Sequence, residues 1–359
     1  IDLPVIKNYD DNKIKIVNLN KKNLNLDNKI TLQGFKNKNL NTKKLVIKNS
    51  KIFILTYDLK ISAFDKSNGS LISTTNINYE KNEDDIVTSF LYFEDSFIVA
   101  LKSGTIIKSD IYGEILWIFK SKKILNTKIS IFDDKIILLY SDEVKGISIS
   151  DGSFRWSHTY DDIPVYQSIG GQYVNFINLF YFILPNNKIG SIDLNLGVKN
   201  NSNFVNMPLI SNINNTNDKI HIYDNYLVYL DEGRQLYTYD IFINDFVIFN
   251  KNITKPFSSI FFNNSLIIKQ GNYLWAINLI NGKTFWLLNN EDLSDNSKII
   301  GITNINEDIL IFFDNGDILT INNKKIVNID NFDQGKISSI FFDKENYILY
   351  LKNGKIVIY

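Results

Sequence analysis

Short apolar runs separated by polar turns extend along the whole chain. Examples are SFIVAL (96–101), KIILLY (135–140), DILIFF (308–313) and NYILYL (346–351), which are rich in β-branched and aromatic residues. Asp, Asn, Gly or Lys bounds each run. Runs of this length and composition predict β-strands. We find no window in which apolar residues recur at helical spacing between helix caps, so the pattern predicts no helix.

An eleven-residue segment recurs along the chain. GISISDGSFRW (146–156) and AINLINGKTFW (276–286) place a turn glycine and a tryptophan at the same offsets. Seven segments of this kind open at Ala63, Ile107, Gly146, Ser191, Thr238, Ala276 and Thr320. The opening residue is usually small, with Ile107 as the exception. The successive gaps are 44, 39, 45, 47, 38 and 44 residues, a period that indicates a solenoid, an array or a propeller.

Each period divides into four strands. In one period they are predicted at 128–132, 135–140, 144–149 and 153–158. Four antiparallel strands per period form the blade of a β-propeller, and blades must stack because one sheet cannot bury both of its faces. Seven periods are complete, and the last segment, 336–359, holds only three strands. We expect KIKIVNL or KITLQGF, near the N-terminus, to complete the eighth blade and close the ring.

The predicted fold is therefore an all-β, eight-bladed propeller in a single domain, 1–359. Residues 1–42 form an N-terminal segment that includes the closing strand, and residues 43–359 form the blades. Lys plus Arg and Asp plus Glu number 39 each, so net charge gives no reason to expect a nucleic-acid partner. No apolar run is long enough to span a membrane. The chain begins at Ile1, which we interpret as a processed or truncated chain, with room for a removed signal peptide and a lipid anchor.

Few residues point to chemistry. The chain has no cysteine, and its two histidines, His158 and His221, are 63 positions apart, whereas a zinc site would need two more ligands. The acid pairs 84–85, 133–134 and 161–162 lie at predicted turns, where turn capping is the favoured interpretation. The sequence therefore predicts no catalytic, cofactor-binding or metal-binding residues.

The repeated segment resembles a known family. Its pattern, a small residue, Asp or Asn two positions later, then Gly and Trp, is similar to the tryptophan-docking repeat of pyrroloquinoline-quinone-type propellers. AINLINGKTFW matches this pattern fully. The resemblance implies that the indoles of Trp117, Trp156 and Trp286 pack against a turn of the adjacent blade.

Among such propellers, the chain resembles the BamB family of outer-membrane protein assembly lipoproteins. PVYQSIGG (164–171) stands where that family has a Pro-x-Leu-x-Leu-Arg-Gly-like segment, and it keeps the proline and a glycine. Two asparagines stand where the family has a pair of aspartates. The partner-binding residues that this resemblance implies are Pro164, Tyr166, Ser168, Ile169, Gly170, Asn215 and Asn217.

The resemblance implies a non-enzymatic scaffold without a cofactor. Such a subunit would be a monomer within a larger complex, at the periplasmic face of the outer membrane of a Gram-negative bacterium. It would bind BamA-like periplasmic domains of the barrel-assembly protein through loops on the propeller rim. Two alternatives stay open, a quinone-dependent sugar or alcohol dehydrogenase and a ligand-binding propeller. The dehydrogenases typically carry a vicinal cysteine pair over the quinone, which this chain lacks.

Overall fold

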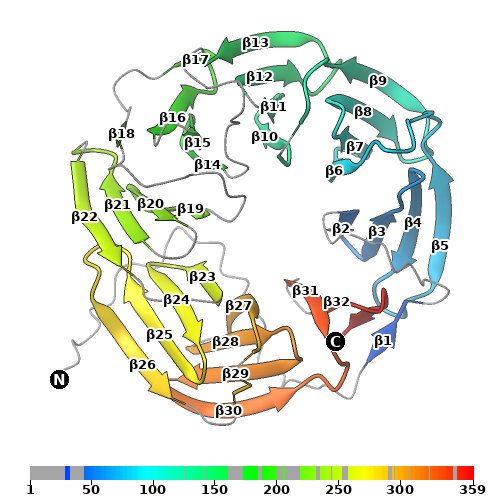
Figure 1. Ribbon diagram of the computed structural model, residues 1–359. Helices are drawn as coiled ribbons and strands as arrows, with labels where there is room; N and C mark the ends of the chain where they lie inside the picture. The colour runs from blue at the N-terminus through cyan, green and yellow to red at the C-terminus, as the bar shows by residue number, and fades with distance from the viewer. Residues whose placement is uncertain are drawn as a thin grey trace.

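The computed structural model shows an eight-bladed β-propeller (Figure 1). It describes residues 29–32, 44–125, 127–140, 142–160, 173–184, 188–199, 205–206, 219–231, 235–243, 245–252, 258–289, 293–294, 296–305, 307–322, 324–342 and 346–359. Within these ranges the regular structure consists of antiparallel sheets and contains no α-helix. The predicted fold class is confirmed.

Each blade is a sheet whose first strand lies nearest the centre of the ring and whose fourth lies at its outer edge (Figure 1). Blade 1 comprises β2 (Leu45–Lys48), β3 (Lys51–Leu55), β4 (Lys60–Asp65) and β5 (Leu71–Asn76). Blade 2 comprises β6 (Val87–Phe93), β7 (Ser96–Leu101), β8 (Thr105–Asp110) and β9 (Ile115–Lys120). Blade 3 comprises β10 (Ser130–Phe132), β11 (Lys135–Leu139), β12 (Glu143–Ser148) and β13 (Phe154–Thr159). Blade 4 comprises β14 (Tyr173–Phe176), β15 (Leu179–Leu184), β16 (Lys188–Asp193) and β17 (Val198–Lys199), and β18 (Val205–Asn206) also pairs with β16.

The second half of the ring repeats this arrangement. Blade 5 comprises β19 (Lys219–Tyr223), β20 (Tyr226–Asp231), β21 (Gln235–Asp240) and β22 (Asp245–Asn252). Blade 6 comprises β23 (Ser258–Phe262), β24 (Ser265–Gln270), β25 (Tyr273–Asn278) and β26 (Thr284–Asn289). Blade 7 comprises β27 (Ile299–Ile305), β28 (Asp308–Phe313), β29 (Asp317–Asn322) and β30 (Lys325–Asn331). Blade 8 comprises β31 (Ile337–Phe342), β32 (Tyr347–Leu351), β33 (Ile356–Ile358) and β1 (Ile30–Thr31).

The ring closes through β1, which is the outer strand of blade 8. Ile30 pairs with Ile358 and Thr31 with Val357 in antiparallel register. The amide of Leu32 donates to the carbonyl oxygen of Ile356 at 3.2 Å. The closing strand therefore comes from KITLQGF, the second of the two candidate segments. This pairing leaves the last blade without an open edge on β33.

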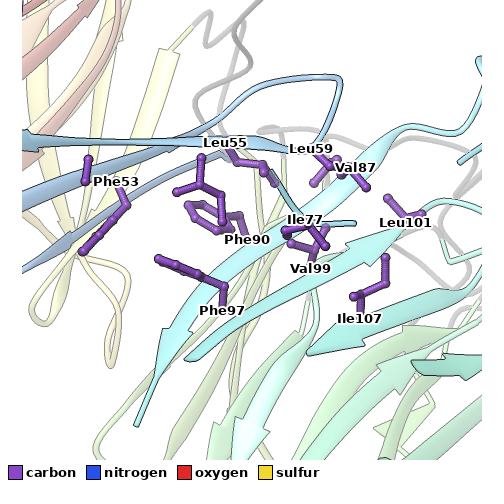
Figure 2. Packing of buried hydrophobic residues seen from close by; sticks show 12 residues of the cluster. Phe53, Leu55, Leu59, Ile77, Val87, Phe90, Phe97, Val99, Leu101 and Ile107 are labelled. Carbon is purple, nitrogen blue, oxygen red and sulfur yellow. The ribbon is translucent and has the colours of Figure 1, made fainter. Parts of the chain in front are cut away.

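The hydrophobic core consists of eight clusters, one at each junction between neighbouring blades. At the junction of blades 1 and 2, Phe53 of β3 meets Phe97 of β7 edge-on, with ring centroids 5.2 Å apart (Figure 2). Phe90 stacks on the same ring at 5.5 Å (Figure 2). Because each blade buries both faces against its neighbours, middle strands such as β7 are buried at every position. This explains their continuous apolar sequences.

The recurring tryptophans lie at these junctions. Trp117 in β9 covers Gly152 in the β12–β13 turn of blade 3, where an added Cβ would lie 2.7 Å from the indole Cε3. Trp156 in β13 covers Gly197 in the matching turn of blade 4, at 2.1 Å from Cγ. Trp286 in β26 is buried in the core cluster between blades 6 and 7. Each indole therefore contacts the blade that follows its own.

The register explains why the repeat favours a small opening residue. Gly146 pairs across the sheet with Trp156, and an added Cβ would lie 2.6 Å from its indole. In blade 2 the residue opposite Trp117 is Lys108 rather than Ile107, so the assignment of Ile107 to this position was wrong. The physical reason is that the turn before Trp117 is one residue shorter than the turn before Trp156. The Gly113 amide donates to the carbonyl oxygen of Asp110, three residues back, whereas the Gly152 amide donates to that of Ser148, four residues back.

Candidate functional site

Antiparallel blades place their connections at two ends of the ring. The connections between successive blades and the turns between second and third strands lie at one end, which we call the connection face. The turns between first and second strands, and between third and fourth strands, lie at the opposite end, which we call the hairpin face. Loops on a rigid scaffold are where binding residues concentrate, so each face is a candidate surface.

The predicted partner-binding residues belong to two blade connections, 161–172 and 207–218. All of them lie outside the described residues, namely Pro164, Tyr166, Ser168, Ile169, Gly170, Asn215 and Asn217. Their assignment stays a prediction. The described residues that border the first connection show how it joins the ring.

Two tyrosines border residues 161–172. Tyr160, after β13, is buried, and its amide donates to the carbonyl oxygen of Asp142 at 2.8 Å. Its ring meets Phe182 of blade 4 edge-on at 5.3 Å. Tyr173 opens β14, and its hydroxyl donates to the carbonyl oxygen of Ile129 at 3.0 Å. Both ends of this connection are therefore held by contacts to neighbouring parts of the ring.

An ion cluster lies beside Tyr160 on the connection face. Lys123, from the connection between blades 2 and 3, lies 3.0 Å from Asp142 and 2.9 Å from Glu143 in the β11–β12 turn region. Lys145 of β12 contacts the other Glu143 oxygen at 3.2 Å. The Glu143 carboxylate is nearly buried, whereas Lys123 and Asp142 are partly exposed. The cluster ties two blades together and presents both signs of charge at this face.

The ion pairs determine the charge state of this cluster. Burial alone would raise the pKa of Glu143, but hydrogen bonds from Lys123 and Lys145 outweigh it and hold the pKa below its ordinary value. Burial alone would lower the pKa of Lys123, but its hydrogen bonds to Glu143 and Asp142 raise it. Glu143 and Lys123 are therefore both ionised at neutral pH, and the contact between them is an ion pair.

A second polar group lies on the same face of blade 1. Tyr57, in the β3–β4 turn, is exposed and has the ammonium group of Lys81 at 3.5 Å from its ring centroid. Lys44, just before β2, lies 5.8 Å from the same ring, and burial together with the charge of Lys81 lowers the pKa of Lys44. An exposed aromatic ring with two cations near it offers an ordered contact point for a partner.

The two histidines weighed for chemistry make ring contacts, and the acid pair 161–162 lies outside the described residues. The two histidines lie in different blades. His221 stacks on Phe261 with ring centroids 4.9 Å apart, and His158 lies edge-on to Tyr160 with ring centroids 4.9 Å apart. Asp85 accepts a hydrogen bond from the Ser103 amide at 2.9 Å, as a turn cap does. Within the described ranges, no group of three or more His, Cys, Asp or Glu side chains could hold a metal ion. The same ranges contain no helix long and apolar enough to cross a membrane.

The ion cluster was not predicted from the sequence. Its one visible signal is the pair Asp142–Glu143 at the start of a strand that is mostly buried. Lys123 is 20 positions away and reaches Glu143 only because blades 2 and 3 stack.

No protein-family model matches the sequence, and the curated proteins include no match. Solved structures are similar in fold. BamB from Moraxella catarrhalis aligns over 89% of this chain and 96% of its own, with a TM-score of 0.63 and 15% identity. The computationally designed Ika8 protein aligns over 88% and 95%, with a TM-score of 0.65 and 11% identity. Saccharomyces cerevisiae Sqt1 aligns over 86% and 92%, with a TM-score of 0.59 and 10% identity. These likenesses support the propeller fold.

Proposed function

We propose that this propeller is a non-enzymatic scaffold of outer-membrane protein assembly, located at the periplasmic face of the outer membrane. The observation that carries the proposal is the match to BamB over nearly the full length of both chains, together with the BamB-like segment Pro164–Gly171. The fold alone would not single out this function, since a designed protein and Sqt1 share it. The partner class is the periplasmic domains of the barrel-assembly protein.

The connection face is the proposed binding surface. It carries the two described residues that border the connection containing Tyr166, the partly exposed charges of Lys123 and Asp142, and the exposed ring of Tyr57. Rigid aromatic residues lose little conformational entropy when a partner covers them, which makes Tyr166 and Tyr57 suitable anchors. The charged pairs around them favour orientation and association rate more than affinity.

The test is a binding titration with the periplasmic domains of the barrel-assembly protein. Tyr166→Asp and Ile169→Glu should together weaken binding roughly ten-fold or more, about 1.4 kcal/mol, without lowering the melting temperature. Tyr112→Asp is the matched control, because Tyr112 is an exposed tyrosine on the hairpin face. An unchanged affinity in the double variant, or no binding by the unaltered protein, would contradict the proposal. Turnover of an alcohol with added pyrroloquinoline quinone, calcium and a dye as electron acceptor would favour the dehydrogenase instead.

A further inference from the structure

The hairpin face of blades 4 and 5 carries a concentration of exposed apolar side chains. Among the described residues, four of the five most exposed large apolar side chains lie there: Ile177 (74% exposed), Phe242 (71%), Leu196 (70%) and Ile243 (65%). We call these four residues the hairpin-face patch. Among the large apolar side chains that the structure describes, Tyr112 of blade 2 is the one that is more exposed. Single exposed apolar residues need no explanation, but a cluster of this kind marks interaction surfaces.

Direct contacts join the turns that carry this patch. Phe176, next to Ile177, meets Phe242 of blade 5 edge-on with centroids 6.1 Å apart. Within blade 4, the side chain of Asn178 donates to the carboxylate of Asp193 at 2.6 Å, which links the β14–β15 turn to the β16–β17 turn that contains Leu196. The patch is therefore one surface built on two blades.

The residue type at the first turn position, Ile177, distinguishes this surface from the matching turns of other blades. Ile177 is the first residue of a two-residue hairpin and has a φ of 55°. The corresponding turn residue in blades 1, 2, 3, 5 and 6 also has a positive φ. These residues are Asn49, Glu94, Asp133, Asp224 and Asn263. Asn and Asp tolerate this conformation, whereas a β-branched residue is strained in it. Strain of this kind, at an exposed position where a polar residue would relieve it, is typical of functional sites.

The charges around the patch are acidic. Asp224 and Asp245 are exposed in the two hairpin-face turns of blade 5. Asp193 and Asp240 cap the turns that contain Leu196 and Phe242, where their carboxylates accept backbone amides. Lys199, in β17 just after the turn that contains Leu196, lies 5.9 Å from the ring centroid of Tyr160. An apolar surface with an acidic rim is complementary to apolar residues flanked by cations.

We propose that the hairpin-face patch binds a segment of a protein partner in which apolar side chains are flanked by Lys or Arg. The acidic rim disfavours two other occupants. An anionic membrane surface would repel it, and a two-fold contact between copies of this chain would set the acidic rims against each other. The patch lies on the hairpin face, at the opposite end of the ring from the strand ends at Tyr160 and Tyr173. This inference therefore does not depend on the proposed partner at the connection face.

Short fluorescein-labelled peptides test the chemistry of the occupant by anisotropy. One peptide has a Leu–Phe core flanked by Lys, the second has the same core flanked by Glu, and the third has a Ser core flanked by Lys. The first should bind, the other two should bind at least roughly ten-fold more weakly, and added salt should weaken the first. Failure of the first peptide to bind, or equal binding of the second, would overturn the proposal.

Variants locate the binding surface. Leu196→Ser, Phe242→Ser and Ile243→Ser together should weaken binding of the Lys-flanked peptide at least roughly ten-fold, whereas the control Tyr112→Ser should not change it. Equal loss in the control, or no loss in the triple variant, would place binding elsewhere. Self-association that the triple variant abolishes would show instead that a second copy of the chain occupies the patch. Binding of the unaltered chain to vesicles of anionic lipid would show instead that a membrane surface occupies it.

Ile177→Asn gives a readout that needs no ligand. Because Asn accepts positive φ more readily than Ile, the variant should melt about 1 to 2 °C higher than the unaltered protein, and it should bind the Lys-flanked peptide more weakly. A gain in melting temperature with a loss of binding would support a surface kept for function at a cost in stability. A lower melting temperature or tighter binding would contradict the role assigned to Ile177.

Discussion

Two successive blade junctions use the same contact in different polar surroundings. At the junction of blades 2 and 3, Trp117 covers Gly152, and at the junction of blades 3 and 4, Trp156 covers Gly197. Both glycines have positive φ, 72° and 68°, and neither leaves room for a Cβ beneath the indole. The shared requirement is thus a glycine turn that lets an indole approach the backbone.

The polar contacts around the two indoles differ. The Trp117 Nε1 donates to the carbonyl oxygen of Ile149 at 3.2 Å, and the same oxygen accepts a bond from Lys108 at 3.0 Å. The Trp156 Nε1 is buried without a hydrogen-bond partner among the described residues, and Gly146 lies opposite it. We infer that steric fit defines the repeat, whereas each junction has its own polar contacts.

Replacing the turn glycines tests the shared part of the comparison, and together with removal of an indole it should have the largest effect. Gly197→Ala and Gly152→Ala should each cost about 2 to 5 kcal/mol, because a left-handed Ala costs about 1 to 2 kcal/mol and overpacking adds about 1 to 3. Gly197 should be the more sensitive, since its Cβ would lie 2.1 Å from the indole rather than 2.7 Å. Denaturant titration measures both.

Gly335→Ala is the control for these glycine variants. Gly335 has a φ of 76° and nothing within 4 Å of an added Cβ, so it should show the backbone cost alone. If Gly197→Ala were no more destabilising than Gly335→Ala, the steric account of the docking contact would be wrong.

Removal of an indole should have an effect of similar size. Trp286→Ala and Trp117→Ala should each cost about 3 to 5 kcal/mol, as for other buried tryptophans. Leu287→Ala should cost less than about 0.5 kcal/mol, because Leu287 is the exposed neighbour of Trp286 on the same strand. Comparable losses from Leu287→Ala and Trp286→Ala in thermal unfolding would show that strand β26, rather than the indole, determines the effect.

Much of the fold could be predicted from the sequence because the repeat is local. Each blade forms from consecutive strands, so the period, the seven complete units and the missing strand were visible as patterns. The sequence did not show whether KIKIVNL or KITLQGF closes the ring, since both have strand-like patterns. That choice depends on contacts distant in sequence, such as Ile30 against Gly69, where an added Cβ would lie 2.7 Å from the Ile30 Cγ2.

The candidate surfaces were less predictable for the same physical reason. The Lys123–Glu143 contact joins two blades, so neither residue alone indicates it. The unusual residue Ile177 could have been noticed by comparing the turns between the first and second strands of the blades. In blades 1, 2, 3, 5 and 6 these turns read NS, ED, DD, DN and NN and begin with a polar residue, whereas in blade 4 the turn reads IN. What the sequence does not show is that Ile177 lies beside the blade 5 turn, because that depends on stacking.

A conservative pair of variants should isolate the polar difference between the two junctions. Trp117→Phe loses the bond to Ile149, whereas Trp156→Phe removes an indole nitrogen that has no described partner. With similar losses of ring area, Trp117→Phe should be the more destabilising by about 1 kcal/mol. Equal melting temperatures of the two variants would mean that the hydrogen bond contributes nothing measurable.

Acidification should have the smallest effect, and it acts on the junction of blades 2 and 3 through the Lys123–Glu143 cluster. The folded pKa of Glu143 lies below its ordinary value of about 4.3, so the stability it contributes is complete above that value and is lost as the pH falls through the lower folded pKa. Other carboxylates with lowered pKa values, such as Asp151, with a pKa of about 2, add to the general acid sensitivity.

The Glu143→Gln variant separates the contribution of Glu143 from that of the other carboxylates. Its melting temperature should lie below that of the unaltered protein at neutral pH, and the gap should narrow below about pH 4, where the unaltered protein also loses the charge. The gap should be modest, because Lys123 and Asp142 are partly exposed and water screens them. A gap that stayed constant from neutral pH to pH 3 would show that Glu143 acts at this junction through packing and not through its charge.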